Sequence, residues 1–210
     1  INGAGIVVNL RNLSINGAFT GFVGVNFISG LALNMHNVSV FKFNSGQAIG
    51  VKFSPSTANA RLMVSNSHIF SNGIGTSGAG ISLFPSVGGS ALAVVRDSTV
   101  EFNSNGVAAL STSGTVKATV QNSAVANNGN FGVSGSGANS IVMMVDGAAV
   151  SNNLNTGILA GGATTTIFIG NSSISGNVTG ASASGGGLLR SYKNNFINGN
   201  GADGTPITGE

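Results

Sequence analysis

The 210-residue sequence predicts an all-β fold, a parallel β-helix in which each coil of the chain stacks on the one before it. Three observations lead to this prediction. A short apolar-Asn-Ser-apolar motif recurs along the chain, turn residues separate short stretches of alternating β-branched residues, and no sustained 3.6-residue apolar stripe indicates a helix. We expect about eight coils of 23–31 residues, spaced about 4.8 Å apart as neighbouring strands are.

The composition is that of a folded chain with few charges. It is 41% hydrophobic and 6% charged, well below the usual quarter of charged residues, and its apolar content argues against disorder. The net charge is +3 and the basic residues are scattered, so no nucleic-acid partner is expected. No apolar run approaches the length of a membrane span. The absence of Cys excludes disulfides and leaves the redox compartment open.

The recurring motif runs from an apolar residue through Asn and Ser to a closing Ile or Val. Its copies are LRNLSI (10–15), MHNVSV (35–40), VSNSHI (64–69), VRDSTV (95–100), VQNSAV (120–125), VDGAAV (145–150), IGNSSI (169–174) and SYKNNFI (191–197). Leucine-rich and RTX calcium repeats do not fit, because their LxxLxL and Gly-Gly-x-Gly-x-Asp patterns are missing. Stacking would therefore turn each motif position into a column, one residue per coil.

The apolar positions of the motif predict both a core and a bend. The closing residues would form an aliphatic column of Ile15, Val40, Ile69, Val100, Val125, Val150, Ile174 and Ile197. The column two positions earlier is mostly small and predicts an inward serine stack. The column five positions earlier is again apolar, although strict alternation would place it on the opposite face. The chain must therefore bend between these columns.

The bend is expected three positions before the closing residue. Asn, Asp and Gly tolerate left-handed backbone geometry best, and stacked Asn side chains can hydrogen-bond as a ladder. The predicted structural Asn ladder comprises Asn12, Asn37, Asn66, Asp97, Asn122, Asn171 and Asn194, with Gly147 at the same position of one coil. These residues are interpreted as structural, which removes them as candidates for chemistry.

A second set of Asn residues stands in the turn that follows each motif. It comprises Asn72, Asn103, Asn128, Asn153, Asn177 and Asn200, with Asn44 one place later. We expect a structural role for this set as well. A Gly-apolar pair then begins another short strand, as in Gly132-Val133.

The copies NSAVANNGNFGV and NSSISGNVTG, together with the ending SYKNNFINGNGADGTP, resemble a known family. They look like uncharacterised bacterial right-handed parallel β-helix repeat proteins of the pectate lyase-like superfamily. The resemblance covers nearly the whole chain and implies a right-handed, single-stranded parallel β-helix. It also implies a single β-helix domain over residues 1–210 whose N-terminal cap is missing, and a secreted, periplasmic or cell-surface location.

The superfamily's enzymes act on acidic polysaccharides and resemble one another in placing carboxylates or calcium-binding Asp on the strand after the long turn. The outward column of that strand here contains no carboxylate, whereas a glycosidase needs two carboxyl groups and a calcium site several oxygen ligands. No catalytic residue, metal site or cofactor is therefore predicted. An acid pair of Asp97 and Glu101 is the weaker alternative, and an ion pair of Arg96 with Asp97 explains Asp97 better. His36 and His68 fall in different outward columns, so no shared metal is expected.

Two functions remain. We expect a non-catalytic scaffold or carbohydrate-binding protein, with polysaccharide as the partner and a binding face around Asn26, Lys52 and Ser82. The alternative is a polysaccharide lyase or hydrolase that acts on an acidic polysaccharide. The sequence leaves the oligomeric state open, and end-to-end stacking of coils between copies is compatible with the predicted fold.

Overall fold

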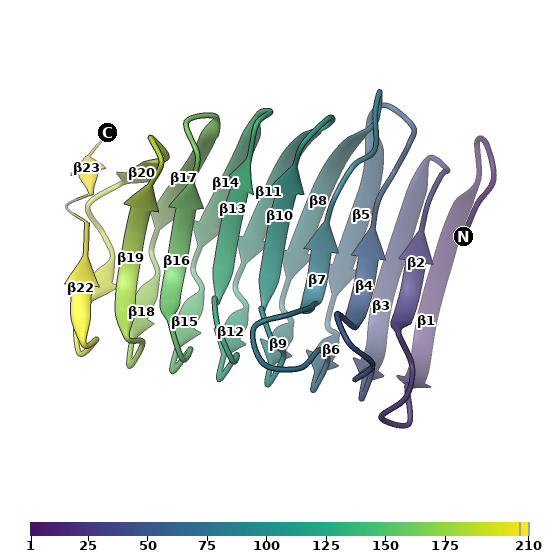
Figure 1. The fold of residues 1–210 in the computed structure, drawn as a ribbon, viewed down its shortest axis with the longest axis horizontal. Coiled ribbons are helices and arrows are strands. Elements are labelled where there is room, and N and C mark those ends of the chain that lie inside the picture. Colours follow the sequence, from purple (N-terminus) through teal and green to yellow (C-terminus); the bar gives the residue numbers. More distant parts are fainter. Residues whose placement is uncertain (206, 210) are drawn as a thin grey trace.

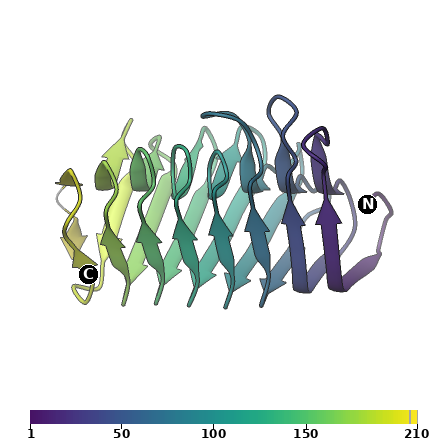
Figure 2. The ribbon, with the colours of Figure 1, turned by 90° about the horizontal axis from the view of Figure 1, so that it is seen from below.

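A computed structural model describes residues 1–205 and 207–209. The chain forms a parallel β-solenoid of about eight coils (Figure 1), and every named element is a strand. The predicted all-β fold and coil stacking are confirmed. Figure 2 shows the strands of successive coils side by side along the long axis. The right-handedness that the resemblance implies stays a prediction.

The strands form two parallel sheets that we divide into three walls. The first wall contains the longer strands before the Asn bend and the second wall contains the shorter strands after it. Both belong to one sheet, because β3 pairs with β5 before the bend and with β6 after it. The third wall is a separate eight-stranded sheet.

The strand bounds follow the repeat. The first wall contains β1 (Val7–Asn16), β3 (Ala32–Phe41), β5 (Ala60–Ser65), β8 (Ser90–Arg96), β11 (Thr115–Gln121), β14 (Ile141–Asp146), β17 (Thr165–Gly170), β20 (Leu188–Ser191) and β23 (Thr208–Gly209). The ten-residue strands β1 and β3 continue into the second wall. That wall also contains β6 (His68–Phe70), β9 (Thr99–Glu101), β12 (Ala124–Ala126), β15 (Ala149–Ser151), β18 (Ser173–Ser175) and β21 (Phe196–Ile197). The third wall contains β2 (Val23–Phe27), β4 (Ile49–Phe53), β7 (Ala79–Leu83), β10 (Val107–Ser111), β13 (Val133–Gly137), β16 (Thr156–Gly161), β19 (Thr179–Ser184) and β22 (Ala202–Gly204).

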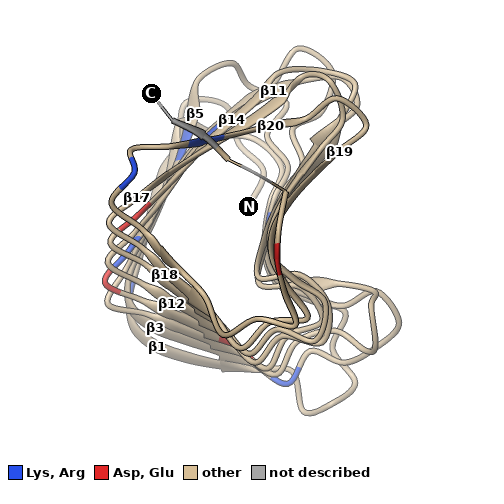
Figure 3. Cartoon of the chain, turned by 90° about the vertical axis from the view of Figure 1, so that its left-hand side faces the viewer, with Lys and Arg blue, Asp and Glu red and all other residues tan. Residues whose placement is uncertain are grey.

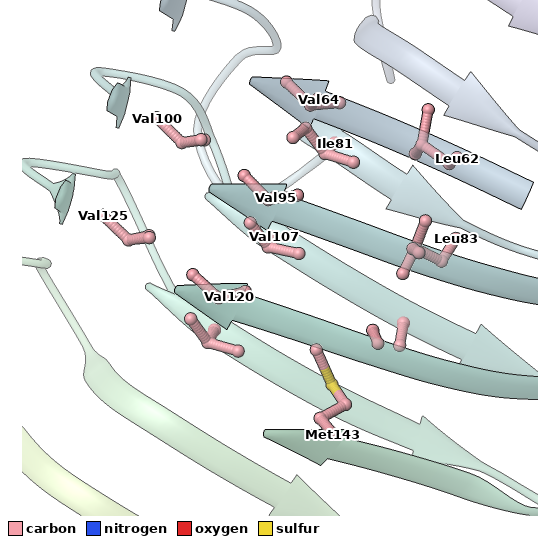
Figure 4. Packing of buried hydrophobic residues seen from close by; sticks show 14 of the residues in the cluster. Leu62, Val64, Ile81, Leu83, Val95, Val100, Val107, Val120, Val125 and Met143 are labelled. Carbon is pink, nitrogen blue, oxygen red and sulfur yellow. The ribbon is translucent and has the colours of Figure 1, made fainter. Parts of the chain in front are cut away.

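The predicted columns are confirmed by the strand register. Val100 pairs with Val125, and Val125 with Val150, in the closing column. Val95 pairs with Val120 in the apolar column five positions earlier. Figure 4 shows Val95, Val100, Val120 and Val125 from two successive coils directed into the core. Each fully buried Val contributes roughly 2 kcal/mol of transfer free energy.

The predicted inward serine stack is also confirmed. Ser98 is 5% exposed, and its Oγ accepts a hydrogen bond from the Ser67 amide at 3.1 Å while donating to the Arg96 carbonyl at 2.7 Å. The Ser123 Oγ accepts from the Ser98 amide at 3.2 Å in the next coil. The small buried hydroxyl thus satisfies an amide that has turned away from the sheet at the bend.

The core at the N-terminal end is larger and aromatic. Phe27 and Phe53 are fully buried, and their rings stack at a centroid distance of 4.6 Å. They occupy paired positions on β2 and β4. The interior therefore holds aromatic rings in the longer first coils and mostly Val, Ile and Ala farther along.

Glycine is required where the third wall begins. A Cβ added to Gly132 would lie 2.6 Å from the Gly157 carbonyl oxygen and 2.8 Å from the Asn153 Nδ2. The column of glycines at this position therefore reflects close backbone approach. Within residues 1–205 and 207–209, no helix meets the length and hydropathy of a membrane span.

Candidate functional site

The predicted bend residues adopt left-handed backbone geometry in seven coils. Their φ values run from 46° at Asn122 to 60° at Gly147. In the last coil the prediction was one residue off, because Lys193 has the left-handed φ of 62° and Asn194 does not. Asn194 is instead held by its side chain, which donates to the Asn171 Oδ1 at 2.8 Å.

Side-chain pairing in the bend column is local. Asn37 donates to the Asn12 Oδ1 at 2.8 Å, and both side chains are exposed. Asp97 pairs with Arg96, the residue that precedes it in the chain. The column's main contribution is therefore to backbone conformation, which is the role predicted from the residue types.

The continuous Asn ladder lies in the second Asn column. Asn72, Asn103, Asn128 and Asn153 are 0–2% exposed. The Asn128 Nδ2 donates to the Asn153 Oδ1 at 2.9 Å, and the Asn128 Oδ1 accepts from the Asn103 amide at 3.1 Å. The predicted structural role of these residues is confirmed.

A second left-handed corner directly precedes this ladder. Its residues include Ser71, Phe102, Asn127, Asn152, Gly176 and Gly199. In the coil of Lys42, Phe43 takes the ladder position, because its amide donates to the Asn72 Oδ1 at 3.2 Å and its ring is 7% exposed. The expected contribution of Asn44 to this column was therefore one residue too late.

A third, shorter Asn ladder was not predicted. Asn130 donates to the Asn105 Oδ1 at 3.0 Å, and Asn155 donates to the Asn130 Oδ1 at 3.0 Å. Asn105 also donates to the Gly78 carbonyl at 2.7 Å. The 25-residue recurrence of these Asn was visible in the sequence, but their position before the Gly-apolar pair shifts by one residue between coils. These residues too are engaged in structure.

The acidic side chains are distributed among separate partners. Asp97 accepts from the Arg96 Nη1 at 3.0 Å, as predicted. Glu101 lies 2.9 Å from the His68 Nε2. The two carboxylates of the alternative acid pair thus bind different side chains. Figure 3, viewed along the solenoid, shows Lys/Arg and Asp/Glu segments dispersed around the walls.

The remaining ionisable candidates are also engaged locally. The His36 Nδ1 lies 3.1 Å from the Ser65 Oγ. Asp146 accepts from the Asn171 Nδ2 at 3.0 Å. Among the described residues, no three His, Cys, Asp or Glu side chains gather as a metal site would require.

The residues predicted to bind polysaccharide occupy adjacent positions on the third wall. Asn26 pairs with Lys52 on the neighbouring strand, and Lys52 pairs with Ser82 on the next. Asn26 is exposed, and Lys52 and Ser82 are half-buried. The structure thus aligns the three side chains along the solenoid axis.

A cavity of about 690 Å³ lies elsewhere, on the outer face of the first wall. We call it the first-wall groove. Its lining residues are Ala32, Asn34, Arg61, Leu62, Met63, Leu92, Ala93, Val94, Lys117, Ala118, Thr119, Val142, Met143, Met144, Phe168 and Tyr192. The groove crosses β3, β5, β8, β11, β14 and β17. Leu62, Ala93, Ala118 and Met143 are buried core residues, so the outward apolar lining comes from the other aliphatic, Met and aromatic residues of this set.

Two outward columns supply the groove. One runs through Arg61, Leu92, Lys117 and Val142, which are successive register partners. The other, two residues along each strand, runs through Met63, Val94, Thr119, Met144 and Phe168. Val142 is 36% exposed although it lies in a strand. Half-buried apolar side chains that gather on an outer face are typical of an interaction site.

The charged residues of the groove are all basic. Arg61 and Lys117 line it, and no Asp or Glu does. Within the described part of the chain, neither cation has an ion-pair partner. At one end Phe168 and Tyr192 stack at a centroid distance of 6.4 Å. The groove can therefore bind apolar and anionic groups, but its lining offers no carboxylate for acid-base chemistry.

The first-wall groove was not predicted from the sequence. The apolar outward residues are visible in the strands as departures from alternation, as in SALAVVR of β8 and IVMMVD of β14. A strand exposed on one face should alternate apolar and polar residues. Strand sequences with apolar residues at outward positions could have indicated that the outer face of this wall is also covered or forms a binding site.

Comparisons with protein-family models, curated proteins and solved structures gave no match. The parallel β-solenoid is established by the strand pairing. The pectate lyase-like superfamily and a bacterial origin rest on the sequence motifs alone.

Proposed function

We propose that the chain is a non-catalytic scaffold that binds a ligand in the first-wall groove. The observation that carries the proposal is the groove itself, whose lining combines outward apolar side chains with Arg61 and Lys117 and includes no carboxylate. Neither cation has an ion-pair partner among the described residues. The stacked Asn ladders support the proposal, because they fix the spacing of the strands that present these side chains.

Binding of the fluorescent dye anilinonaphthalene sulfonate tests the groove, because the dye is apolar and anionic and reports accessible apolar surface. The folded protein should enhance dye fluorescence, and Val94→Asp should remove most of the enhancement. Leu159→Asp is the matched control, since Leu159 is a half-buried outward residue of the third wall. Circular dichroism would verify that both variants fold. Equal fluorescence from wild type and Val94→Asp would contradict the proposal.

A second candidate function is polysaccharide binding on the third wall. The observation that favours it is the alignment of Asn26, Lys52 and Ser82 on successive strands. A glycan array would test it, with Lys52→Ala as the disruptive variant and Lys117→Ala as a control on the other face. Loss of a glycan signal in Lys52→Ala alone would support this site. Equal glycan signals from Lys52→Ala and Lys117→Ala would mean that the sugar binds outside the face around Asn26, Lys52 and Ser82.

The enzymatic alternative is a lyase or hydrolase acting on acidic polysaccharide. Reducing-end and unsaturated-uronate assays on uronate polymers would detect it. Product release by this chain would overturn the proposal of a non-catalytic scaffold. The secreted, periplasmic or cell-surface location stays a prediction, and fractionation of expressing cells would test it.

A further inference from the structure

We propose that the first-wall groove docks an amphipathic α-helix of a partner protein, oriented along the solenoid axis, with acidic side chains two helical turns apart. The inference rests on the proposed function, because it assumes that the groove is a binding site. It adds the chemistry and shape of the ligand.

The residue types in the groove are those of a protein interface. Aromatic residues, Met and Arg are enriched at the centres of interfaces, and Asp and Glu are depleted. The groove contains Met63, Met144, Phe168, Tyr192 and Arg61 and no acidic residue. Flexible Met side chains adapt to a partner's surface. A sugar ligand would instead favour polar side chains and exposed aromatic faces along the whole groove.

The two cations set a spacing for the partner's charges. Arg61 and Lys117 are both register partners of Leu92, on either side of it. They are therefore two strands apart, a separation of about 9.6 Å. Both side chains are exposed, and neither has an ion-pair partner among the described residues. Two anions about 10 Å apart would complement them.

A helix matches this spacing better than a strand. Residues i and i+7 of an α-helix lie about 10.5 Å apart on one face. Residues on one face of a strand lie about 6.6 or 13 Å apart, so neither pair fits. A polyproline II segment repeats every 9.3 Å or so, but its recognition grooves are lined by aromatic rings. Here the aliphatic side chain of Leu92 lies between the two cations.

The length and width of the groove also suit a helix. From Met63 to Phe168 the column spans four strand intervals, about 19 Å. A helix covers that distance with about 13 residues. Its apolar residues at i+3 and i+4 would lie over Leu92 and Val94, between the two acidic side chains. Amphipathic helices bind apolar grooves through this anchor pattern.

A second copy of this chain does not supply such a segment. Every element named in the described residues is a strand. Asp97 pairs with Arg96, and Glu101 pairs with His68. Asp146 is bonded by Asn171. The described residues of a second copy therefore offer no such helix, and we assign it to a partner protein.

Fluorescence anisotropy with a synthetic helical peptide tests the inference. The probe has about 14 residues, with Glu at i and i+7 and Leu at i+3 and i+4. The protein should bind it, and the double variant Arg61→Glu/Lys117→Glu should bind it at least about tenfold more weakly. A second peptide with Lys in place of both Glu should recover binding to that double variant. Arg11→Glu/Lys52→Glu is the control, because it makes the same charge change outside the groove.

Four results would overturn the inference. Equal binding of a peptide with Glu at i and i+3 would show that the spacing is not recognised. If a polyproline peptide with acidic residues three positions apart binds more strongly than the helical peptide, the ligand is a polyproline II segment and not a helix. Self-association of the protein in sedimentation, lost in Val94→Asp, would identify a second copy as the occupant. Dye binding that depends on Val94 but is not displaced by the helical peptide would leave the proposed function standing while this inference fails.

Discussion

The Asn128 Nδ2 donates a hydrogen bond to the Asn153 Oδ1 at 2.9 Å, with both side chains at most 1% exposed. The same side chain donates to the Val100 carbonyl at 3.3 Å and accepts from the Asn103 amide at 3.1 Å. One amide group therefore connects three successive coils. In a solenoid, where each coil contacts mainly its neighbours, such links set the stability of the stack.

Asn128→Ala should destabilise the protein by about 3 kcal/mol, because it leaves several buried polar groups without partners. Among these are the Asn103 amide and the Val100 carbonyl. Urea unfolding followed by circular dichroism measures the loss. The control is Asn122→Ala in the exposed bend column, which should cost about 1 kcal/mol through its left-handed φ of 46°. Equal costs at both positions would contradict the distinction between the two columns.

Gly132→Ala should be strongly destabilising, by about 3 kcal/mol or more, because the new methyl group overlaps backbone and buried side chains. Its Cβ would lie 2.6 Å from the Gly157 carbonyl oxygen. At Gly161 the nearest atoms lie 3.4 Å from an added Cβ, so Gly161→Ala should be neutral or slightly stabilising. Thermal melting of the two variants gives the comparison, and a stable Gly132→Ala protein would show that the coils can separate.

Phe53→Ala should cost about 3–5 kcal/mol by creating a cavity in the core. The Phe53 ring is fully buried and stacks on Phe27. Phe53→Leu keeps most of the volume and should cost less than half as much. Denaturant midpoints of the two variants would establish the order. Equal costs would mean that the loss of ring stacking, common to both variants, and not the lost volume determines stability here.

Lys193→Gly should stabilise the last coil by about 0.5–1 kcal/mol, because glycine adopts the left-handed φ of 62° without steric cost. Asn194→Gly should have the opposite effect, since it removes the hydrogen bonds between Asn194 and Asn171. Hydrogen exchange of the β20 and β21 amides monitors this coil directly. Slower exchange of these amides in Asn194→Gly would indicate that the left-handed residue of this corner is Asn194, as predicted from the sequence.

The repeat was sufficient to predict the coils, their register and most corners. Asn122 and its equivalents predict the bend, because Asn tolerates left-handed backbone geometry. Val120 and Val125 predict the core, because both are apolar although strict alternation would place them on opposite faces. The errors fell at the irregular ends of the repeat. Lys193 takes the bend in a coil with one extra residue, because Ile169 pairs with Ser191 and Ile174 with Ile197. Phe43 fills the place of a ladder Asn.

The distinction between the Asn columns could not be predicted, because burial depends on the other walls. Asn122 and Asn128 are both Asn in turns of the same coil. The third wall closes over Asn128 and leaves Asn122 exposed. Two residues of identical type thus differ in energetic role.

Columns and coil number follow from the sequence, since each coil stacks on its neighbour and equivalent residues meet at a nearly constant separation along the chain. The groove depends on the assembled solenoid. Arg61 and Lys117 are 56 positions apart in the sequence, yet strand pairing places both beside Leu92. Which outward side chains gather into one groove depends on the packing of six neighbouring strands at once.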